Sequence, residues 1–141
     1  DETTLSKTLD DATDDTSAHN QSSIVFLLET DEKQKFLFTG DAGRDAFNHV
    51  PQTLLGKVKD VTWMKVPHHG SKHNLDSTII KHVNPEIAYI STEKQGKYLN
   101  HSTVFALKKN GTKVYSTSQN RSTIRHGAIK TREGWTKIEP M

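Results

Sequence analysis

The stretch VTWMKVPHHGSKHN at positions 61–74 indicates the fold most clearly, together with the earlier stretch KFLFTGDAG at positions 35–43. Each begins as a short apolar run typical of a strand and continues into glycine beside an acidic or imidazole side chain. Glycine permits a tight turn and leaves space for a ligand next to the polar residue. The two stretches therefore predict strands at 35–39 and 60–66, each followed by a turn that carries chemistry.

The flanking sequence extends this alternation of strands and helices. The predicted strands cover 23–29, 35–39, 60–66, 86–91 and 112–117, with a closing hairpin at 127–131 and 134–139. The predicted helices cover 43–57, which is weak and is interrupted or started at Pro51, 75–83 with Asn74 as its cap, and 102–109 with Ser102 as its cap. This order predicts an α/β fold with a mixed sheet, whose sites lie at the carboxyl ends of the strands.

The composition of the 141 residues excludes several classes of protein. Apolar residues make up 32%, and no segment reads as a signal peptide or approaches the ~20 apolar residues of a membrane span. Even with glycine added, the apolar share stays below the roughly 45–50% of an average domain. The absence of cysteine excludes disulfides and thiolate metal ligands. These features leave the localisation open and predict no membrane contact from this segment.

Charge is unevenly distributed along the chain. The first 20 residues carry a net charge of −5 and the remaining 121 a net charge of +7. Residues 1–18 show no apolar periodicity, so we expect an exposed acidic lead-in or loop, with regular structure beginning at Ser23. The basic remainder suits an anionic substrate or a nucleic acid, although a lysine-rich solvated surface explains it equally well.

Three polar clusters lie next to predicted strands. His19-Asn20 precedes the first strand, Thr39-Gly40-Asp41 follows the second, and His68-His69-Gly70-Ser71 follows the third. Taken singly, His19 and Asp41 fit a loop histidine and a turn aspartate better than metal ligands. Together, imidazole and carboxylate suit Zn²⁺, Mn²⁺ or Fe²⁺, and one carboxylate can bridge two ions. His101 stands between a loop and a helix, where it could act as a general acid or contact a substrate.

In this order, the clusters resemble the C-terminal half of the metallo-β-lactamase fold, and most closely the hydrolase domain of DNA-uptake competence proteins. The matching text is HNQSSIVFLLE, KFLFTGDAG, VTWMKVPHHGSKHN, NPEIAYIST, NHSTVFALKKNGTKVYST and the closing GAI. The resemblance implies a C-terminal half of an αββα sandwich over residues 19–141, with helices on one face of a mixed sheet. The family's first motif, His-x-His-x-Asp-His, does not occur in this sequence. We therefore expect only the second half of that fold here.

The resemblance also implies roles for individual residues. Asp41 occupies the place of an aspartate that bridges two metal ions, and one of His68 and His69 that of a ligand to the second ion. The other histidine of that pair would donate a proton or contact the substrate. His19, or Asn20 in its place, would bind the first ion. The implied catalytic set is Asp41, His69 and His101, and the implied metal set is His19, Asp41, His68 and His69.

These residues predict a fragment of a metal-dependent hydrolase that cleaves a phosphodiester or a related ester with a metal-activated water. Two divalent ions, zinc or manganese, are expected in the complete protein, and partial or no occupancy in this chain. The expected partners are a missing N-terminal half of the same fold or a second copy, and a nucleic acid or other phosphodiester substrate. The alternatives are a non-catalytic anion- or nucleic-acid-binding module with remnant ligands, and a half-domain that only completes another chain.

Overall fold

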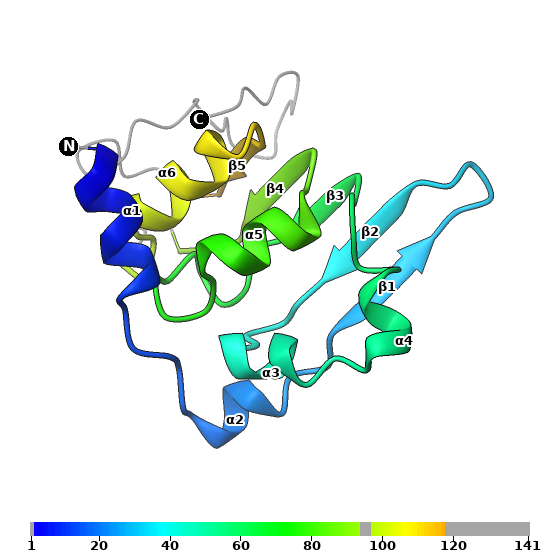
Figure 1. Ribbon diagram of the computed structural model, residues 1–141, viewed down its shortest axis with the longest axis horizontal. Coiled ribbons are helices and arrows are strands. Elements are labelled where there is room, and N and C mark those ends of the chain that lie inside the picture. Colours follow the sequence, from blue (N-terminus) through cyan, green and yellow to red (C-terminus); the bar gives the residue numbers. More distant parts are fainter. Residues whose placement is uncertain (1, 94–96, 118–141) are drawn as a thin grey trace.

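The apolar runs form a five-stranded sheet in the spatial order β1-β2-β3-β4-β5 (Figure 1). The strands are β1 (Phe26–Glu29), β2 (Lys35–Phe38), β3 (Trp63–Lys65), β4 (Ile87–Ile90) and β5 (Lys113–Ser116). β1 and β2 form an antiparallel pair, while β2, β3, β4 and β5 run parallel to one another. This computed structural model describes residues 2–93 and 97–117, so the expected closing hairpin lies outside the described residues. The predicted α/β fold with a mixed sheet is confirmed.

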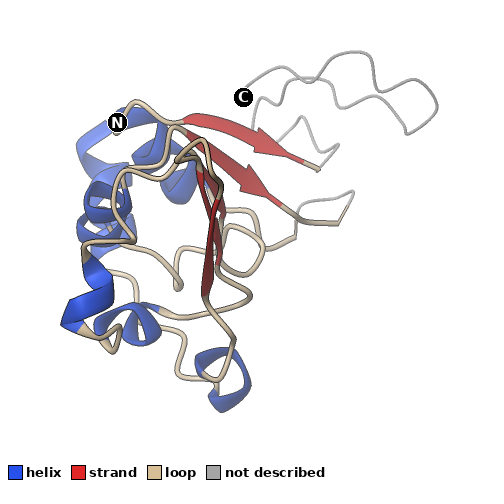
Figure 2. Cartoon of the chain, turned by 90° about the vertical axis from the view of Figure 1, so that its right-hand side faces the viewer, coloured by secondary structure: helices blue, strands red, loops and turns tan. Residues whose placement is uncertain are grey.

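Most of the helices lie on one side of the strands (Figure 2). They are α1 (Glu2–Asp10), α2 (Ala18–Gln21), α3 (Arg44–Asn48), α4 (Gln52–Leu55), α5 (Ser77–Val83) and α6 (His101–Lys109). The weak helix expected over 43–57 is two short helices, because Pro51 ends the first segment and stands at the N-cap of α4. Within the described ranges, no helix is long and apolar enough to span a bilayer.

Two helices begin later or earlier than the sequence predicts, because a different side chain caps each. Asp76 caps α5 by accepting a hydrogen bond from the backbone N–H of Ile79, and Asn74 is buried elsewhere. Asn100 caps α6 by accepting from the N–H of Ser102, which lies inside the helix. The predicted caps at Asn74 and Ser102 are therefore wrong, although both helices form.

The core lies between the helices and one face of the sheet. Leu37, Met64, Ala88 and Val114 occupy matching positions on β2, β3, β4 and β5, and each is almost completely buried. α5 and α6 contribute further buried aliphatic side chains, and α1 packs against both helices. Strand alternation, which sends successive side chains to opposite faces, explains why these four residues share one face.

The other face of the sheet carries a row of aromatic side chains that crosses all five strands. We call this the aromatic face; its members are Phe26, Phe36, Phe38, Trp63, Tyr89 and Tyr115. Neighbouring rings lie 4.6–6.4 Å apart between centroids. None of these side chains is fully buried, and Phe26 is 51% exposed. The sheet therefore has a buried aliphatic face and a partly exposed aromatic one.

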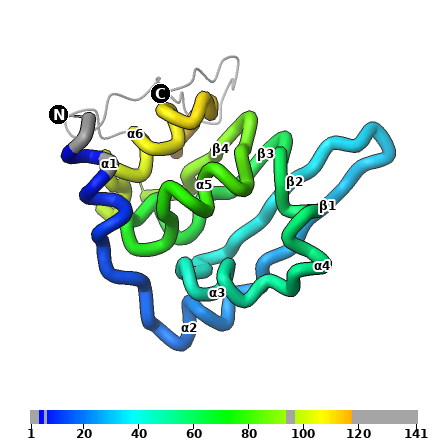
Figure 3. The backbone as a smooth tube through the Cα atoms, in the orientation of Figure 1, coloured from blue at the N-terminus to red at the C-terminus, as the bar shows by residue number. Residues whose placement is uncertain are grey.

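The acidic N-terminal segment is part of the folded body. Figure 3 shows the chain leaving α1 and running along one side of the molecule to α2, before it enters β1. Leu9 of α1 is fully buried, and the guanidinium of Arg44 donates hydrogen bonds to the carbonyls of Leu9 and Asp10. The expectation that regular structure begins at Ser23 is therefore wrong.

The acidic side chains of this segment bind the N-termini of helices far along the chain. The Asp10 carboxylate accepts from the N–H of Ser77 at 2.8 Å, at the start of α5. The Asp14 carboxylate accepts from the N–H groups of Arg44 and Asp45 at 2.9 and 3.0 Å, at the start of α3. A carboxylate satisfies the unpaired N–H groups of a helix start and complements its dipole. The concentration of acid in this segment thus has a structural use.

Candidate functional site

The turn after β2 holds Asp41 at the carboxyl edge of the sheet. Thr39 is fully buried, and its hydroxyl donates to the carbonyl of Lys65 at 2.7 Å. Gly40 has a φ of +55°, and a Cβ there would lie 3.0 Å from Cβ of Ser23, so the turn requires glycine. The N–H of Asp41 donates to the Ser23 hydroxyl at 3.1 Å. The Asp41 side chain remains 45% exposed at this edge.

The turn after β3 is joined to the first turn by its backbone. The N–H of His68 donates to the carbonyl of Gly40 at 3.0 Å, and His68 has a φ of +52°. This left-handed conformation is unfavourable for a residue with a side chain. Gly70 also has a positive φ, and a Cβ there would lie 2.9 Å from Leu99 and 3.0 Å from Ile90. The second turn is therefore closely fitted between the first turn and the end of β4.

Four charged or titratable neighbours act on the His68 imidazole. Burial lowers its pKa from the ordinary value of 6.5; Asp41 and Asp15 raise it, and His69 and Lys65 lower it, with a net lowering. Nδ1 of His68 is buried and has no hydrogen-bond partner among the described residues. A buried ring nitrogen without a partner is costly, so it is available for a ligand or a proton transfer.

His69 is oriented by the end of β4. Its Nδ1 lies 2.7 Å from the carbonyl oxygen of Ser91, which can only accept, so Nδ1 carries the proton in this hydrogen bond. Nε2 of the neutral ring then keeps its lone pair. The His69 ring stacks on Tyr98 at 5.8 Å between centroids, and His68 lies edge-on to both rings at 4.7 and 5.2 Å. The two histidines and Tyr98 form one aromatic group beside the site.

Asp15 belongs to this region and was not a candidate from the sequence. Its carboxylate accepts hydrogen bonds from Asn20 at 2.6 Å, from the N–H of Ser17 at 2.9 Å and from the buried side chain of Asn74 at 3.3 Å. Burial alone would raise the pKa of Asp15. These hydrogen bonds outweigh that effect and hold the pKa below its ordinary value. Asp15 lies in an acidic segment without periodicity, so only its contact with distant residues reveals it.

His19 and His101 are both exposed, and within the described ranges neither belongs to a group of side chains that could hold a metal ion. His19 is exposed on α2, while its neighbour Asn20 faces Asp15. His101 is exposed at the start of α6. The preceding residue, Asn100, connects this helix start to the 67–70 turn, because its N–H donates to the carbonyl of Gly70 at 3.1 Å.

The carboxylate and imidazole groups of the site are of the kind that binds a divalent metal ion, but in the described part of the chain too few of them lie together to hold one. Within residues 2–93 and 97–117, no group of three or more His, Cys, Asp or Glu side chains lies close enough to hold an ion. Asp41 and the His68-His69 pair are therefore donors of the right kind in an incomplete set.

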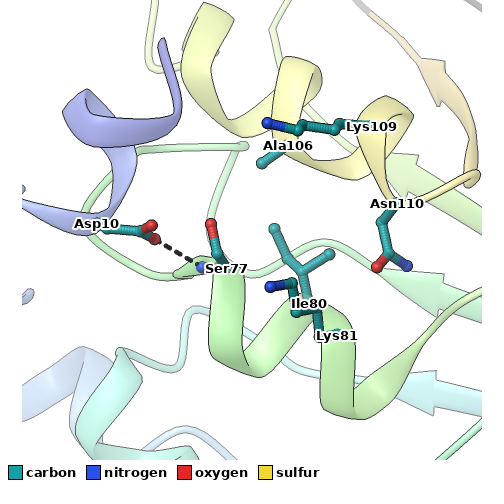
Figure 4. Close-up of a pocket in the computed structure, with 7 residues that line it drawn as sticks. All are labelled: Asp10, Ser77, Ile80, Lys81, Ala106, Lys109 and Asn110. Atoms are coloured by element: carbon teal, nitrogen blue, oxygen red, sulfur yellow. Dashed lines mark hydrogen bonds between the residues drawn. The ribbon is translucent and has the colours of Figure 1, made fainter. Parts of the chain in front are cut away.

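A separate cavity of about 320 Å³ lies on the helical side of the molecule, between α1, α5 and α6 (Figure 4). Asp10, Ser77, Ile80, Lys81, Ala106, Lys109 and Asn110 line it. Figure 4 shows the Asp10 carboxylate turned toward the backbone N–H of Ser77, which is the helix-capping bond described above. None of the candidate site residues lines this cavity, so it is distinct from the strand-edge site.

Comparison with known proteins finds two relevant similarities. The chain is 31% identical over 128 residues to ComE operon protein 3 of Bacillus subtilis, and 31% identical over 130 residues to Recombination protein 2 of Haemophilus influenzae. Each match covers 89% of this chain and 16% of the relative, so the chain spans about a sixth of the length of these curated relatives. No family model matches the chain, and no solved structure matches it significantly. The predicted resemblance to competence proteins is confirmed, while the names of the relatives state neither a fold nor a hydrolase activity.

Proposed function

We propose that this chain contributes one side of the active site of a metal-dependent hydrolase with a metallo-β-lactamase-like fold, which cleaves a phosphodiester or a related ester. The observation that carries the proposal is the junction of the two turns. The N–H of His68 donates to Gly40, and the charge of Asp41 acts on the His68 imidazole. A carboxylate and an imidazole are thus held together at the carboxyl edge of the sheet, where α/β folds build their sites.

The hydrogen bond from His69 supports this residue as the metal ligand of the histidine pair. Histidines that bind metals usually donate their other ring N–H to a carboxylate or a backbone carbonyl, as Nδ1 of His69 does to Ser91. Asp41 would hold the ions from the other turn, and His68 would contact the substrate or move a proton through its unpaired Nδ1. Bound divalent ions would lower the pKa of a water molecule to near neutrality and so supply the nucleophile.

The aromatic face supports a second part of the proposal, that a complementary half covers this side of the sheet. The aromatic face carries six aromatic residues, of which Phe26 is 51% exposed and the other five are partly exposed. Contiguous exposed apolar side chains of this kind mark an interaction surface. A second sheet packed there would bury the row, as in a β-sandwich. The 141 residues hold two tryptophans, Trp63 and Trp135, so the Trp135→Phe variant reports on Trp63 alone. Mixing this variant with a segment that carries the His-x-His-x-Asp-His motif should shift the emission of Trp63 to shorter wavelength. No shift would count against this partner.

Nucleic-acid binding is the second candidate function, because an aromatic and a cationic side chain, Tyr98 and Lys97, lie together at an exposed point beside His69. Tyr98 is 47% exposed, stacks on His69, and has the ammonium of Lys97 5.0 Å above its ring. Aromatic and cationic side chains at one exposed point can stack on a base and contact its phosphate. Binding that is steeply salt-dependent, and that is unchanged by a chelator and by Asp41→Ala, would favour this function over the hydrolase.

The hydrolase proposal is tested by phosphodiesterase activity on bis(p-nitrophenyl) phosphate with Mn²⁺ or Zn²⁺. We expect activity only when the chain is combined with a segment that carries the missing motif, and loss of that activity in Asp41→Asn but not in the control Asp45→Asn, which changes an exposed carboxylate of α3. His69→Gln should weaken metal binding more than His68→Gln. Full activity of this chain alone, or equal activity of Asp41→Asn and wild type in the combined protein, would contradict the proposal.

A further inference from the structure

Lys65 connects the two turns of the site through a single nitrogen atom. Its Nζ donates to the carbonyl of Gly40 at 2.7 Å, of His68 at 3.0 Å and of Val66 at 3.1 Å. Gly40 belongs to the turn after β2, and the other two carbonyls belong to the turn after β3. An ammonium has three N–H groups, so all of them are used within this network.

Strand alternation explains why this lysine reaches the site. Met64 points into the core, so Lys65 and Trp63 point to the opposite face, and Lys65 stands at the last position of β3. Its side chain is only 23% exposed, and Nζ lies 3.9 Å from Oδ1 of Asp41. Burial of an ammonium is unfavourable unless acceptors surround it. The three carbonyls supply those acceptors, and the Asp41 carboxylate places an opposite charge nearby.

The network holds His68 in a conformation that it would not otherwise prefer. His68 has a φ of +52°, which is unfavourable for a residue with a side chain. Its N–H is bound by the Gly40 carbonyl, and its own carbonyl is bound by Lys65. The Gly40 carbonyl also accepts from Lys65, so the three residues form a closed ring of hydrogen bonds. Without the Lys65 ammonium, the hydrogen bond from His68 N–H to the Gly40 carbonyl is the one bond of this ring that remains.

We infer that Lys65 is a positioning residue, whose ammonium fixes the turn that carries Asp41 against the turn that carries His68 and His69. It touches neither the substrate nor the reacting atoms in this role. An effect of Lys65 on metal binding or hydrolysis rests on the proposed function. An effect of Lys65 on the positions of the two turns does not depend on that function. The inference therefore makes a prediction that can be measured in the absence of any metal.

The test compares Lys65→Met and Lys65→Arg with the control Lys35→Met. Lys35 is a suitable control because its Nζ also donates to a backbone carbonyl, that of Lys59, away from the site. Hydrogen exchange is measured at the His68 amide, and at the Ile87 amide as a reference, since Ile87 N–H binds Thr62 elsewhere in the sheet. The NMR signals of the His68 ring are recorded alongside, without metal, and Mn²⁺ affinity is measured separately.

We expect Lys65→Met to accelerate exchange at His68 by about tenfold or more, with little change at Ile87, and to shift the His68 ring signals. Lys65→Arg should restore part of the protection, because a planar guanidinium cannot place three donors on one nitrogen. Lys35→Met should change neither readout. Unchanged exchange at His68 in Lys65→Met, equal acceleration at Ile87, or full protection in Lys65→Arg would overturn the inference. Faster exchange at His68, with no Mn²⁺ binding by wild type even in combination with the missing motif, would support the inference and reject the proposed function.

Discussion

Replacement of Asn74 by alanine should lower the free energy of unfolding by about 2–4 kcal/mol. Asn74 is 1% exposed, and its side-chain amide donates to the Asp15 carboxylate at 3.3 Å and to the carbonyls of Asp41 and Ala42 at 3.2 Å each. It thus joins the 71–74 loop to the acidic segment and to the turn that carries Asp41. Asn74→Ala removes all three contacts at once.

The magnitude follows from the number of donors and from the burial of the acceptors. An amide nitrogen has two hydrogens, so it makes two full bonds among its three acceptors, each worth about 0.5–1 kcal/mol net. The Ala42 carbonyl belongs to a fully buried residue and would lose this donor, which adds about 1–2 kcal/mol. Asn48→Ala, which changes an exposed residue of α3, should alter stability by no more than about 0.5 kcal/mol and serves as the control.

Asn74→Asp separates the hydrogen-bonding explanation from packing, because it keeps the side-chain volume and removes both donors. It also places a buried carboxylate beside Asp15, so at pH 7 it should cost at least about 1 kcal/mol more than Asn74→Ala. Repulsion and burial raise the pKa of the new carboxyl in the folded state, so its penalty is present at neutral pH and shrinks as the pH falls through that raised pKa.

Urea unfolding followed by circular dichroism at pH 7 and pH 5 measures these differences. The expected order of stability at pH 7 is wild type, then Asn74→Ala, then Asn74→Asp, with the two variants closer together at pH 5. If Asn74→Asp proved as stable as Asn74→Ala at pH 7, or if Asn74→Ala lost less than about 1 kcal/mol, the hydrogen-bonding role assigned to Asn74 would be wrong.

Two other substitutions test the electrostatics of the site and the anchoring of the N-terminal helix. Asp41→Asn should lower the pKa of His68, because Asp41 is the main influence that raises it, whereas Asp45→Asn should not; an NMR titration of the ring decides. The pKa of His68 lies below 6.5 in the folded protein, so the neutral ring is favoured by folding. Its contribution to the free energy of unfolding should be fully present above pH 6.5 and should be lost as the pH drops through the folded pKa. The total loss should be larger in Asp41→Asn. Arg44→Met should lose about 2–4 kcal/mol, because its guanidinium donates to four backbone carbonyls, and Lys57→Met, an exposed control, should lose little; thermal unfolding measures both. Equal losses in these two variants would refute the anchoring role of Arg44.

The sequence predicted the sheet and the edge that the two candidate turns share, because both follow from local patterns. Alternating apolar residues predict strands, and glycine beside Asp41 and beside His69 predicts tight turns at their carboxyl ends. The parallel order of β2, β3 and β4 then brings those turns to one edge without further information.

The sequence could not predict features that depend on contacts between distant segments. Asp10 and Asp14 bind helix starts 67 and about 30 residues further along the chain, and no local pattern marks them. Asn74 and Asp76 are both good capping residues, and the choice between them depends on the burial of Asn74 against Asp15. The roles of Asp15 and Lys65 are of the same kind, since each depends on partners supplied by other elements.

Calorimetric titration of Mn²⁺ and of Zn²⁺ tests the proposed half-site most directly. We predict weak binding to this chain alone, because the described residues supply too few ligands to close a site, and tight binding of two ions once a segment with the His-x-His-x-Asp-His motif is added. Asp41→Asn should abolish the tight binding. Tight stoichiometric binding by this chain alone, or tight binding in the combined protein that Asp41→Asn leaves unchanged, would show that Asp41 and the histidine pair are not half of a metal site.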